Sequence, residues 1–174
     1  MLIFKQINET DTKEIQSLIP LWFSYMRELY NEELDIQSES DEKLIEWLNE
    51  RIKVQGQRDC IYFEGIYYDG LLAGFVFYAI DLGGIKGIIE PGLGYIMEMY
   101  VVPNLRRQKI GTTAFVHMKK VLSNDGAMEL YLTPDIKSGV HFWKSIGFKD
   151  SGKVDPDNKA PIYIMAINAA NKSK

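Results

Sequence analysis

Residues 98–112 combine an apolar strand pattern, a basic turn and the start of a helical pattern. Three cationic side chains, Arg106, Arg107 and Lys109, stand in the turn, directly before the predicted helix. A helix N-terminus has unpaired N–H donors and a partial positive charge, so it can hold a phosphate group. Gly111 leaves room for a ligand close to the backbone. The segment is a candidate anion-binding site, or else a solvated basic turn before an ordinary helix.

Hydrophobic spacing predicts the elements that must position this segment. Apolar residues follow one helical face in the N-terminal part, where Pro20 should break or kink the first helix. The pattern then changes to aromatic and β-branched runs, and Asp69-Gly70 indicates a two-residue hairpin turn. Predicted strands are 2–4, 61–68, 71–80, 95–102, 128–133 and 161–167, and predicted helices begin after Asp11 and cover about 44–52, 109–122 and 138–146.

This order of elements predicts an α/β fold. The hairpin must be antiparallel, whereas a strand–helix–strand step with parallel pairing needs a right-handed crossover. We therefore expect a mixed sheet with helices on both faces, formed as one domain over residues 1–174. Ligands of such sheets favour the carboxyl ends of the parallel strands. Here those ends are the turn after Val102 and the residues near Thr133.

Composition indicates an ordinary globular protein and excludes several classes. The 174 residues are 46% hydrophobic and 25% charged, which is enough apolar material for a buried core. The net charge of −4 argues against non-specific nucleic-acid binding, which needs a basic surface. The single cysteine, Cys60, excludes an internal disulfide, and with two histidines a metal cluster is not expected. Without a signal peptide or an apolar run of about 20 residues, we expect a cytoplasmic protein that does not enter a membrane.

The basic turn resembles the pyrophosphate signature of the GNAT superfamily of N-acetyltransferases, written Arg/Gln-x-x-Gly-x-Gly/Ala. Arg106 matches its first position and Gly111 its last, while Lys109 stands where the first glycine is usual. Met99-Tyr100-Val101 resembles the strand that precedes the signature. Residues 139–148 resemble the second block of the family, Ala-x-x-Phe-Tyr-x-x-x-Gly-Phe. Two blocks in the right order, with one helix and one strand between them, make this resemblance specific.

The resemblance implies a mostly antiparallel sheet with a splayed pair of parallel strands, acetyl-CoA as cosubstrate, and acetyl transfer to an amine. The pantetheine arm would pair with the main chain of Met99 and Val101, and a strand N–H would polarise the thioester carbonyl. The diphosphate would lie on the amides from Gln108 to Thr112. The implied cofactor contacts are Met99, Tyr100, Val101, Arg106, Arg107, Gln108, Lys109, Ile110, Gly111, Thr112, Phe142 and Trp143.

Transfer to an amine requires a base, because an alkyl amine with a pKa of about 10 is mostly protonated near neutral pH. Glu98 is the first candidate, since it is a charged residue in an apolar strand, directly before the cofactor-contacting residues. Glu64 and Asp81, on neighbouring predicted strands, are the substitutes. The alternative for Glu98 is an outward-facing or ion-paired carboxylate.

The leaving thiolate needs a proton, which in many relatives comes from a tyrosine of the second block. Trp143 stands at that position here, and an indole N–H is not a useful acid. Tyr131 is therefore the second catalytic candidate, with Tyr100 and His141 as substitutes. Protonation by solvent of a thiolate with a pKa of about 8.5 is a further route.

The N-terminal helices are expected to shape the acceptor side, as this part of the chain does in the family. Tyr25 and Trp47 lie beside apolar helical faces and could line a pocket or simply be partly buried. The glycine-rich loop 82–94 could close over substrate or be a surface connection. An acidic cluster could attract a cation or be a solvated helix end, and its members are Glu28, Glu32, Glu33 and Asp35.

The sequence thus predicts an acetyl-CoA-dependent N-acetyltransferase in which a primary amine attacks directly within a ternary complex, without a metal. The acceptor would be a small molecule or a peptide, and its identity and the pairing of two chains as a homodimer stay open. The alternatives are an acyl-CoA-binding module with weak or no catalysis, and a partner-binding domain that has lost the cofactor.

Overall fold

The computed structural model describes residues 1–33, 39–135, 137 and 139–167, without the side chains of residues 31–33. Its contacts divide the chain into two compact units. Unit 1 comprises Met1–Phe77 and Glu98–Ala114, and unit 2 comprises Tyr78–Met97 and Phe115–Lys174. The expectation of a single domain stays a prediction. No helix in the described part of the chain is long and apolar enough to cross a membrane.

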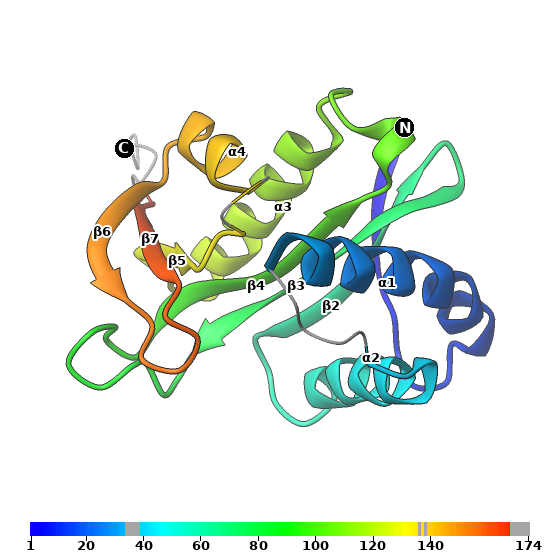
Figure 1. Ribbon diagram of the computed structural model, residues 1–174, viewed down its shortest axis with the longest axis horizontal. Coiled ribbons are helices and arrows are strands. Elements are labelled where there is room, and N and C mark those ends of the chain that lie inside the picture. Colours follow the sequence, from blue (N-terminus) through cyan, green and yellow to red (C-terminus); the bar gives the residue numbers. More distant parts are fainter. Residues whose placement is uncertain (34–38, 136, 138, 168–174) are drawn as a thin grey trace. The chain divides into compact units, whose positions relative to one another are not determined.

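Unit 1 is built from the N-terminal strands and two helices, which lie next to each other on one side of β2 and β3 (Figure 1). β1 and β2 pair antiparallel, with Leu2 opposite Tyr68. The elements are β1 (Leu2–Gln6), α1 (Thr12–Glu33), α2 (Asp41–Gln55), β2 (Ile61–Tyr68), most of β3 (Leu71–Asp81), the end of β4 (Leu93–Val101), a 3-10 turn (Pro103–Leu105) and the start of α3 (Ile110–Asn124).

The predicted hairpin between β2 and β3 is confirmed. Asp69 and Gly70 have φ angles of 48° and 84°, the positive values that a tight two-residue turn requires. The expected break of the first helix is wrong, because α1 continues through Pro20. Leu18 and Trp22 are fully buried on either side of the proline. Packing against the core therefore outweighs the one backbone hydrogen bond that proline removes.

Unit 2 contains the only parallel pairing among the described strand pairs. Gly94 lies opposite Leu130 and Tyr95 opposite Tyr131, and the ladder stops there, although β4 continues to Val101. Such a short ladder is what a splayed strand pair requires. The elements are the end of β3, the start of β4, most of α3, β5 (Glu129–Leu132), α4 (Gly139–Ser145), β6 (Lys149–Val154) and β7 (Pro161–Ala166).

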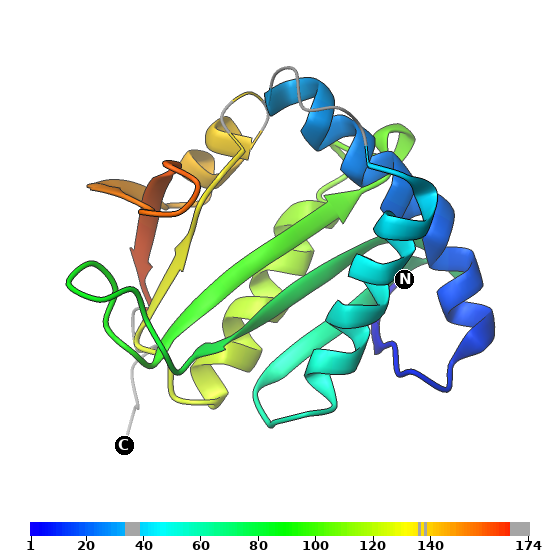
Figure 2. The same cartoon turned by 60° about the horizontal axis from the view of Figure 1, so that its bottom comes forward.

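β6 is an element that the sequence pattern did not predict. It pairs antiparallel with β7, which in turn pairs antiparallel with β5 (Figure 2). Across the chain, hydrogen bonding orders the seven strands as β1-β2-β3-β4-β5-β7-β6. The predicted α/β fold, with a mixed and mostly antiparallel sheet that contains one parallel pair, is confirmed.

Candidate active site

Glu98, the predicted base, lies on the part of β4 that belongs to unit 1. Its side chain is 10% exposed, and its Oε1 accepts a hydrogen bond of 2.7 Å from the Nε of Arg51 on α2. Arg51 also donates from Nη1 to the carbonyl of Trp47, at 3.0 Å. Its guanidinium carbon lies 4.9 Å from the centre of the Trp22 ring. The ion-paired state anticipated as the alternative for Glu98 is therefore present, in a buried setting.

The second carboxylate oxygen of Glu98 is in a different situation. Oε2 is buried and has no hydrogen-bond partner among the described residues. Burial raises the pKa of Glu98, and the charge and hydrogen bond of Arg51 oppose that rise. A carboxylate that keeps one free oxygen in a water-poor environment can accept a proton from a group placed beside it.

Arg106 binds protein groups at the end of β4. Its Nη2 donates to Glu28 of α1, at 2.7 Å to Oε2 and 3.0 Å to Oε1, and its Nε donates to the carbonyl of Val101 at 2.8 Å. The Tyr100 hydroxyl also donates to Glu28, at 3.1 Å. Burial and the Glu28 carboxylate raise the pKa of Tyr100 to about 12. The predicted diphosphate contact of Arg106 stays a prediction, and it would require the guanidinium to leave Glu28.

The turn before α3 has the backbone of an anion site. Arg107 and Lys109 have φ angles of 63° and 64°, in the left-handed region. The first backbone bond into the helix runs from the Thr113 amide to the Lys109 carbonyl, at 2.9 Å. Within the described residues, the amides of Ile110, Gly111 and Thr112 find no acceptor. Free amides beside turned backbone form the concave donor sets that bind anions in many proteins.

The strand segment predicted to meet the pantetheine arm is packed closely on β3. The amide of Val102 donates to the Ala73 carbonyl at 2.9 Å. A Cβ atom on Gly74 would lie 2.0 Å from the Tyr100 carbonyl oxygen, so only glycine fits there. Met99 is half-buried and Tyr100 is buried. The main-chain path from Met99 to Val101 is thus fixed by its neighbour.

Tyr131, the second predicted catalytic residue, belongs to unit 2. Its hydroxyl donates to Asp81 Oδ2 at 2.6 Å, and its ring stacks on Tyr95 with centroids 4.4 Å apart. Burial and the Asp81 carboxylate raise the pKa of Tyr131 far above its ordinary value. The other Asp81 oxygen accepts from the amides of Gly83 and Gly84, at 3.0 Å each. Asp81, a substitute base in the sequence analysis, therefore links Tyr131 to the loop between β3 and β4.

That glycine-rich loop joins the end of β3 to the start of β4 (Figure 2) and is held by several contacts. The Gly92 amide donates to the Asp81 carbonyl, and Lys153 Nζ on β6 donates to the Ile88 carbonyl at 2.7 Å. Ile89 is 5% exposed and packs with Tyr131 and Ile162. These contacts favour a packed surface connection over a loop that closes on substrate.

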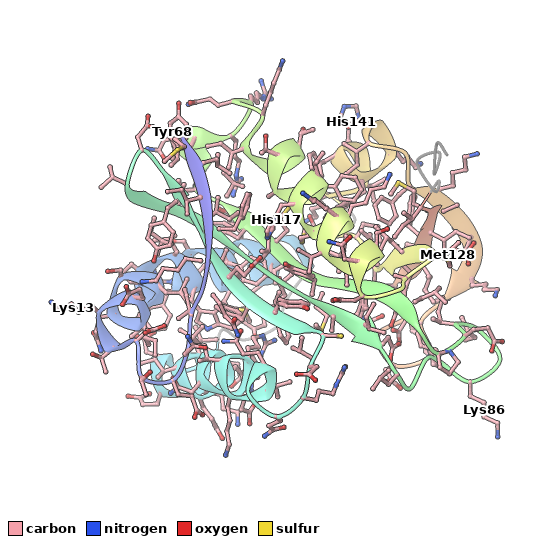
Figure 3. All side chains as sticks on the ribbon, turned by 180° about the vertical axis from the view of Figure 1, so that it is seen from behind. Lys13, Tyr68, Lys86, His117, Met128 and His141 are labelled. Carbon is pink, nitrogen blue, oxygen red and sulfur yellow. The ribbon has the colours of Figure 1, made fainter. Side chains whose placement is uncertain are left out.

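The second sequence block forms α4 and the turn after it. Trp143 is buried and packs edge-on against Phe115, Phe142 and Phe148, at centroid distances of 6.2, 5.0 and 5.4 Å. Figure 3 shows His141 on α4 and His117 on α3. His141 is exposed. The aromatic cluster explains why a tryptophan is accommodated at the usual tyrosine position, and the cofactor contacts of Phe142 and Trp143 stay predictions.

The remaining acceptor-side candidates lie in unit 1. Tyr25 is half-buried, with its ring 5.3 Å from Phe75 and 5.7 Å from Tyr100, and Trp47 is half-buried on α2. Asp35 and the side chains of Glu32 and Glu33 lie outside the described residues. The sequence pattern did not identify Arg51 as a site residue, because it is one of several charged residues on α2 and only the fold brings it to Glu98.

Comparison with known proteins identifies the class. The acetyltransferase (GNAT) family matches residues 22–148, which is most of the chain. The chain therefore belongs to the GNAT acetyltransferase family, as the two sequence blocks predicted.

Individual relatives are more distant. A spermidine N(1)-acetyltransferase of Thermoplasma acidophilum is 31% identical over 128 residues, a match that covers 72% of this chain and 66% of the relative. The match thus spans slightly less than two thirds of that relative.

Solved structures share the fold at low sequence identity. The PaiA N-acetyltransferase of Thermoplasma acidophilum, solved in complex with coenzyme A, is 20% identical and superimposes with a TM-score of 0.68, covering 96% of this chain and 99% of the other. An aminoglycoside N-acetyltransferase in complex with CoA is 15% identical, with a TM-score of 0.65 and coverage of 89% and 92%.

Proposed function

We propose that the protein is an N-acetyltransferase that moves an acetyl group from acetyl-CoA to a primary amine by direct attack. The observation that carries this proposal is the buried Glu98 carboxylate, which stands on β4 shortly before the strand runs into a turn with free amides. A proton acceptor and an anion cradle are thus joined by one short strand segment. Membership of the GNAT acetyltransferase family supports the same reaction.

The turn suits the diphosphate of acetyl-CoA. The amides of Ile110, Gly111 and Thr112 would donate to phosphate oxygens, and the exposed side chains of Arg107 and Lys109 add two positive charges. The bound cosubstrate supplies an activated acetyl thioester. The main chain of Met99 and Val101 would orient it.

The proposed reaction forms a C–N bond and breaks the thioester C–S bond. Glu98 Oε2 takes a proton from the attacking amine, directly or through water, which is a contribution of roughly 10²–10⁴ in rate. The leaving thiolate takes a proton from solvent or from Tyr131. For Tyr131 to act, its hydroxyl must first leave Asp81.

The acceptor is proposed to be a small-molecule amine, with a peptide amine as the alternative. Relatives named for spermidine and for aminoglycosides support a small cationic acceptor. Neither a metal, a nucleic acid nor a membrane has a part in the proposed reaction. A cytoplasmic location and a homodimer stay predictions.

Two measurements test the proposal. Coenzyme A and acetyl-CoA should each raise the melting temperature, because a ligand at about 100 times its Kd raises the free energy of unfolding by about 2.7 kcal/mol. Free thiol released from acetyl-CoA is then followed with polyamines, aminoglycosides, amino acids and peptides. A thermal shift without thiol release would indicate the acyl-CoA-binding module, and no shift would indicate loss of the cofactor.

A further inference from the structure

Arg51 is held in place by groups other than Glu98. It donates from Nη1 to the Trp47 carbonyl, one turn earlier on α2, and its guanidinium lies over the Trp22 ring. Trp22 is fully buried, and its indole N–H donates to the Leu44 carbonyl at 2.7 Å. The guanidinium position is therefore set by the packing of α1 on α2.

The contact between Arg51 and Glu98 uses one oxygen only. Arginine often binds a carboxylate through two parallel hydrogen bonds, one to each oxygen. Here Nε binds Oε1, Nη1 is turned to Trp47, and Oε2 is buried without a partner among the described residues. A buried polar atom without a partner lowers stability, so its retention calls for a functional reason.

We propose that Arg51 is a positioning residue for acetyl transfer: it binds Glu98 through Oε1 alone and so presents Oε2 as the atom that takes the proton of the amine. This inference rests on the proposed function, in which Glu98 is the base. Trp22 and Trp47 contribute to this positioning, because they hold the Arg51 guanidinium that in turn holds the Glu98 carboxylate.

Arg51 also affects the ionisation of this base. Among the described residues, the ionisable group that shifts the pKa of Glu98 is Arg51 of α2. Its positive charge favours the charged carboxylate, whereas burial disfavours it. Removing the guanidinium should therefore raise the pKa of Glu98. Less of the carboxylate would then be ionised near neutral pH, and the acid side of the rate profile would move to higher pH.

The test compares Arg51→Gln and Arg51→Lys with wild type, with Lys53→Gln, at an exposed position of α2, as control. For Arg51→Gln we expect the acid limb of kcat/KM to move up by about one pH unit or more and kcat to fall at least about tenfold. The KM for acetyl-CoA should stay unchanged. Arg51→Lys keeps the positive charge but lacks the planar set of guanidinium N–H donors. The acid limb of its kcat/KM profile should therefore stay near that of wild type, while its kcat still falls. Lys53→Gln should match wild type.

A double-mutant cycle separates positioning from a general structural role. In a Glu98→Gln background, replacing Arg51 should cost little further activity, because its effect passes through the carboxylate. Additive losses, or an acid limb that does not move, would overturn the inference. If Arg51→Gln does not fold, the cycle with Arg51→Lys decides by the same criterion.

A spectroscopic readout distinguishes this inference from the proposed function. In protein labelled with ¹³C at glutamate carboxyls, the Glu98 signal is the one missing from Glu98→Gln. Its titration midpoint should rise in Arg51→Gln. An unmoved midpoint in a protein that acetylates amines overturns the inference alone, whereas a wild type that releases no thiol with any amine overturns the proposed function and the inference together.

Discussion

The carboxylate of Glu98 meets two conditions that a base for amine acetylation must satisfy. It is shielded from water, and one of its oxygens is left free by its partner. An exposed carboxylate would be too weak a base to take a proton from an ammonium group near neutral pH, because its pKa would stay near its ordinary value. Burial is thus the property that links this residue to the proposed reaction.

Glu98→Gln should lower turnover by roughly 10²–10⁴ near neutral pH, since the amide cannot take a proton. The activity should recover in part as the pH rises, because more of the amine is then already neutral. Initial rates across the pH range measure this, with Glu50→Gln, at an exposed position of α2, as control. A pH profile equal to that of wild type would remove Glu98 from the base role.

Lys109 illustrates how a departure from a sequence signature can keep its geometry. The family has glycine at this position, and Lys109 adopts the left-handed backbone, with φ of 64°, that glycine reaches without strain. Lys109→Gly should therefore raise the free energy of unfolding by about 1 kcal/mol. In urea unfolding, the control Lys120→Gly, at an exposed position inside α3, should lower it by about the same amount. Destabilisation by both changes would refute this account of the turn.

Sequence reasoning could propose a candidate site where its residues are neighbours in the chain. The strand, the basic turn and the helix start follow one another from Glu98 to Thr112, so spacing alone could define them. Arg51, the partner of Glu98, lies far away in the sequence, and no local pattern marks it. Glu28 was marked only as part of an acidic cluster, and the sequence did not pair it with Arg106. Ion pairs between residues distant in the sequence could be identified only from the fold.

At the level of elements, the first turn of α3 is the part on which the proposed cofactor binding depends. Gly111→Val should abolish coenzyme A binding, because a branched side chain would occupy the space beside the free amides. The fold should survive, since Gly111 lies in helical backbone, where valine costs about 0.6 kcal/mol relative to alanine. Calorimetric titration with coenzyme A measures the loss. Ser123→Val, at an exposed position in the last turn of α3, is the control, and unchanged affinity in Gly111→Val would contradict the prediction.

The close approach of β3 and β4 in unit 1 depends on Gly74. An alanine Cβ would lie 2.0 Å from the Tyr100 carbonyl oxygen, which is backbone and cannot turn aside. Gly74→Ala should thus lower the free energy of unfolding by at least about 3 kcal/mol. Gly56→Ala is the matched control: its Cβ would lie 3.5 Å from the nearest atom, and it should change stability by less than about 1 kcal/mol. Equal effects of the two changes in denaturant titration would show that the contact is not tight.

Among the elements, amphipathic segments were predictable and the others were not. β6 has the sequence Lys-Asp-Ser-Gly-Lys-Val, which lacks alternating apolar residues because the strand is mostly exposed. α1 contains a proline that local rules treat as a break, yet tertiary packing holds the helix together. The loop between β3 and β4 has a flexible composition, but Ile85, Ile88 and Ile89 anchor it in an apolar cluster.

At the scale of the whole molecule, several groups of the described residues that titrate in the alkaline range have raised pKa values. Carboxylate partners raise the pKa of Lys5 and Lys43, burial raises that of Tyr67, and burial with Glu28 raises that of Tyr100 to about 12. A group whose folded pKa exceeds its unfolded pKa keeps its proton longer in the folded state. The stability that it contributes is complete below the unfolded pKa and is lost as the pH rises through the folded one.

The contribution of Tyr100 to the free energy of unfolding should consequently be lost between pH 10 and about pH 12. Urea unfolding at about pH 8 and about pH 11 measures the fall. Tyr100→Phe should reduce it, because phenylalanine has no proton to lose. A curve that stays flat over this range would contradict the assigned shifts.

The position of β6 at one end of the strand order has a consequence for concentrated solutions of the protein. This outer strand carries Lys149 and Lys153, and its register shifts between Asp150 and Lys153. An incoming chain would meet charged side chains and an interrupted row of main-chain donors and acceptors. Sheet growth from molecule to molecule, the first step of many fibrils, is disfavoured at this border.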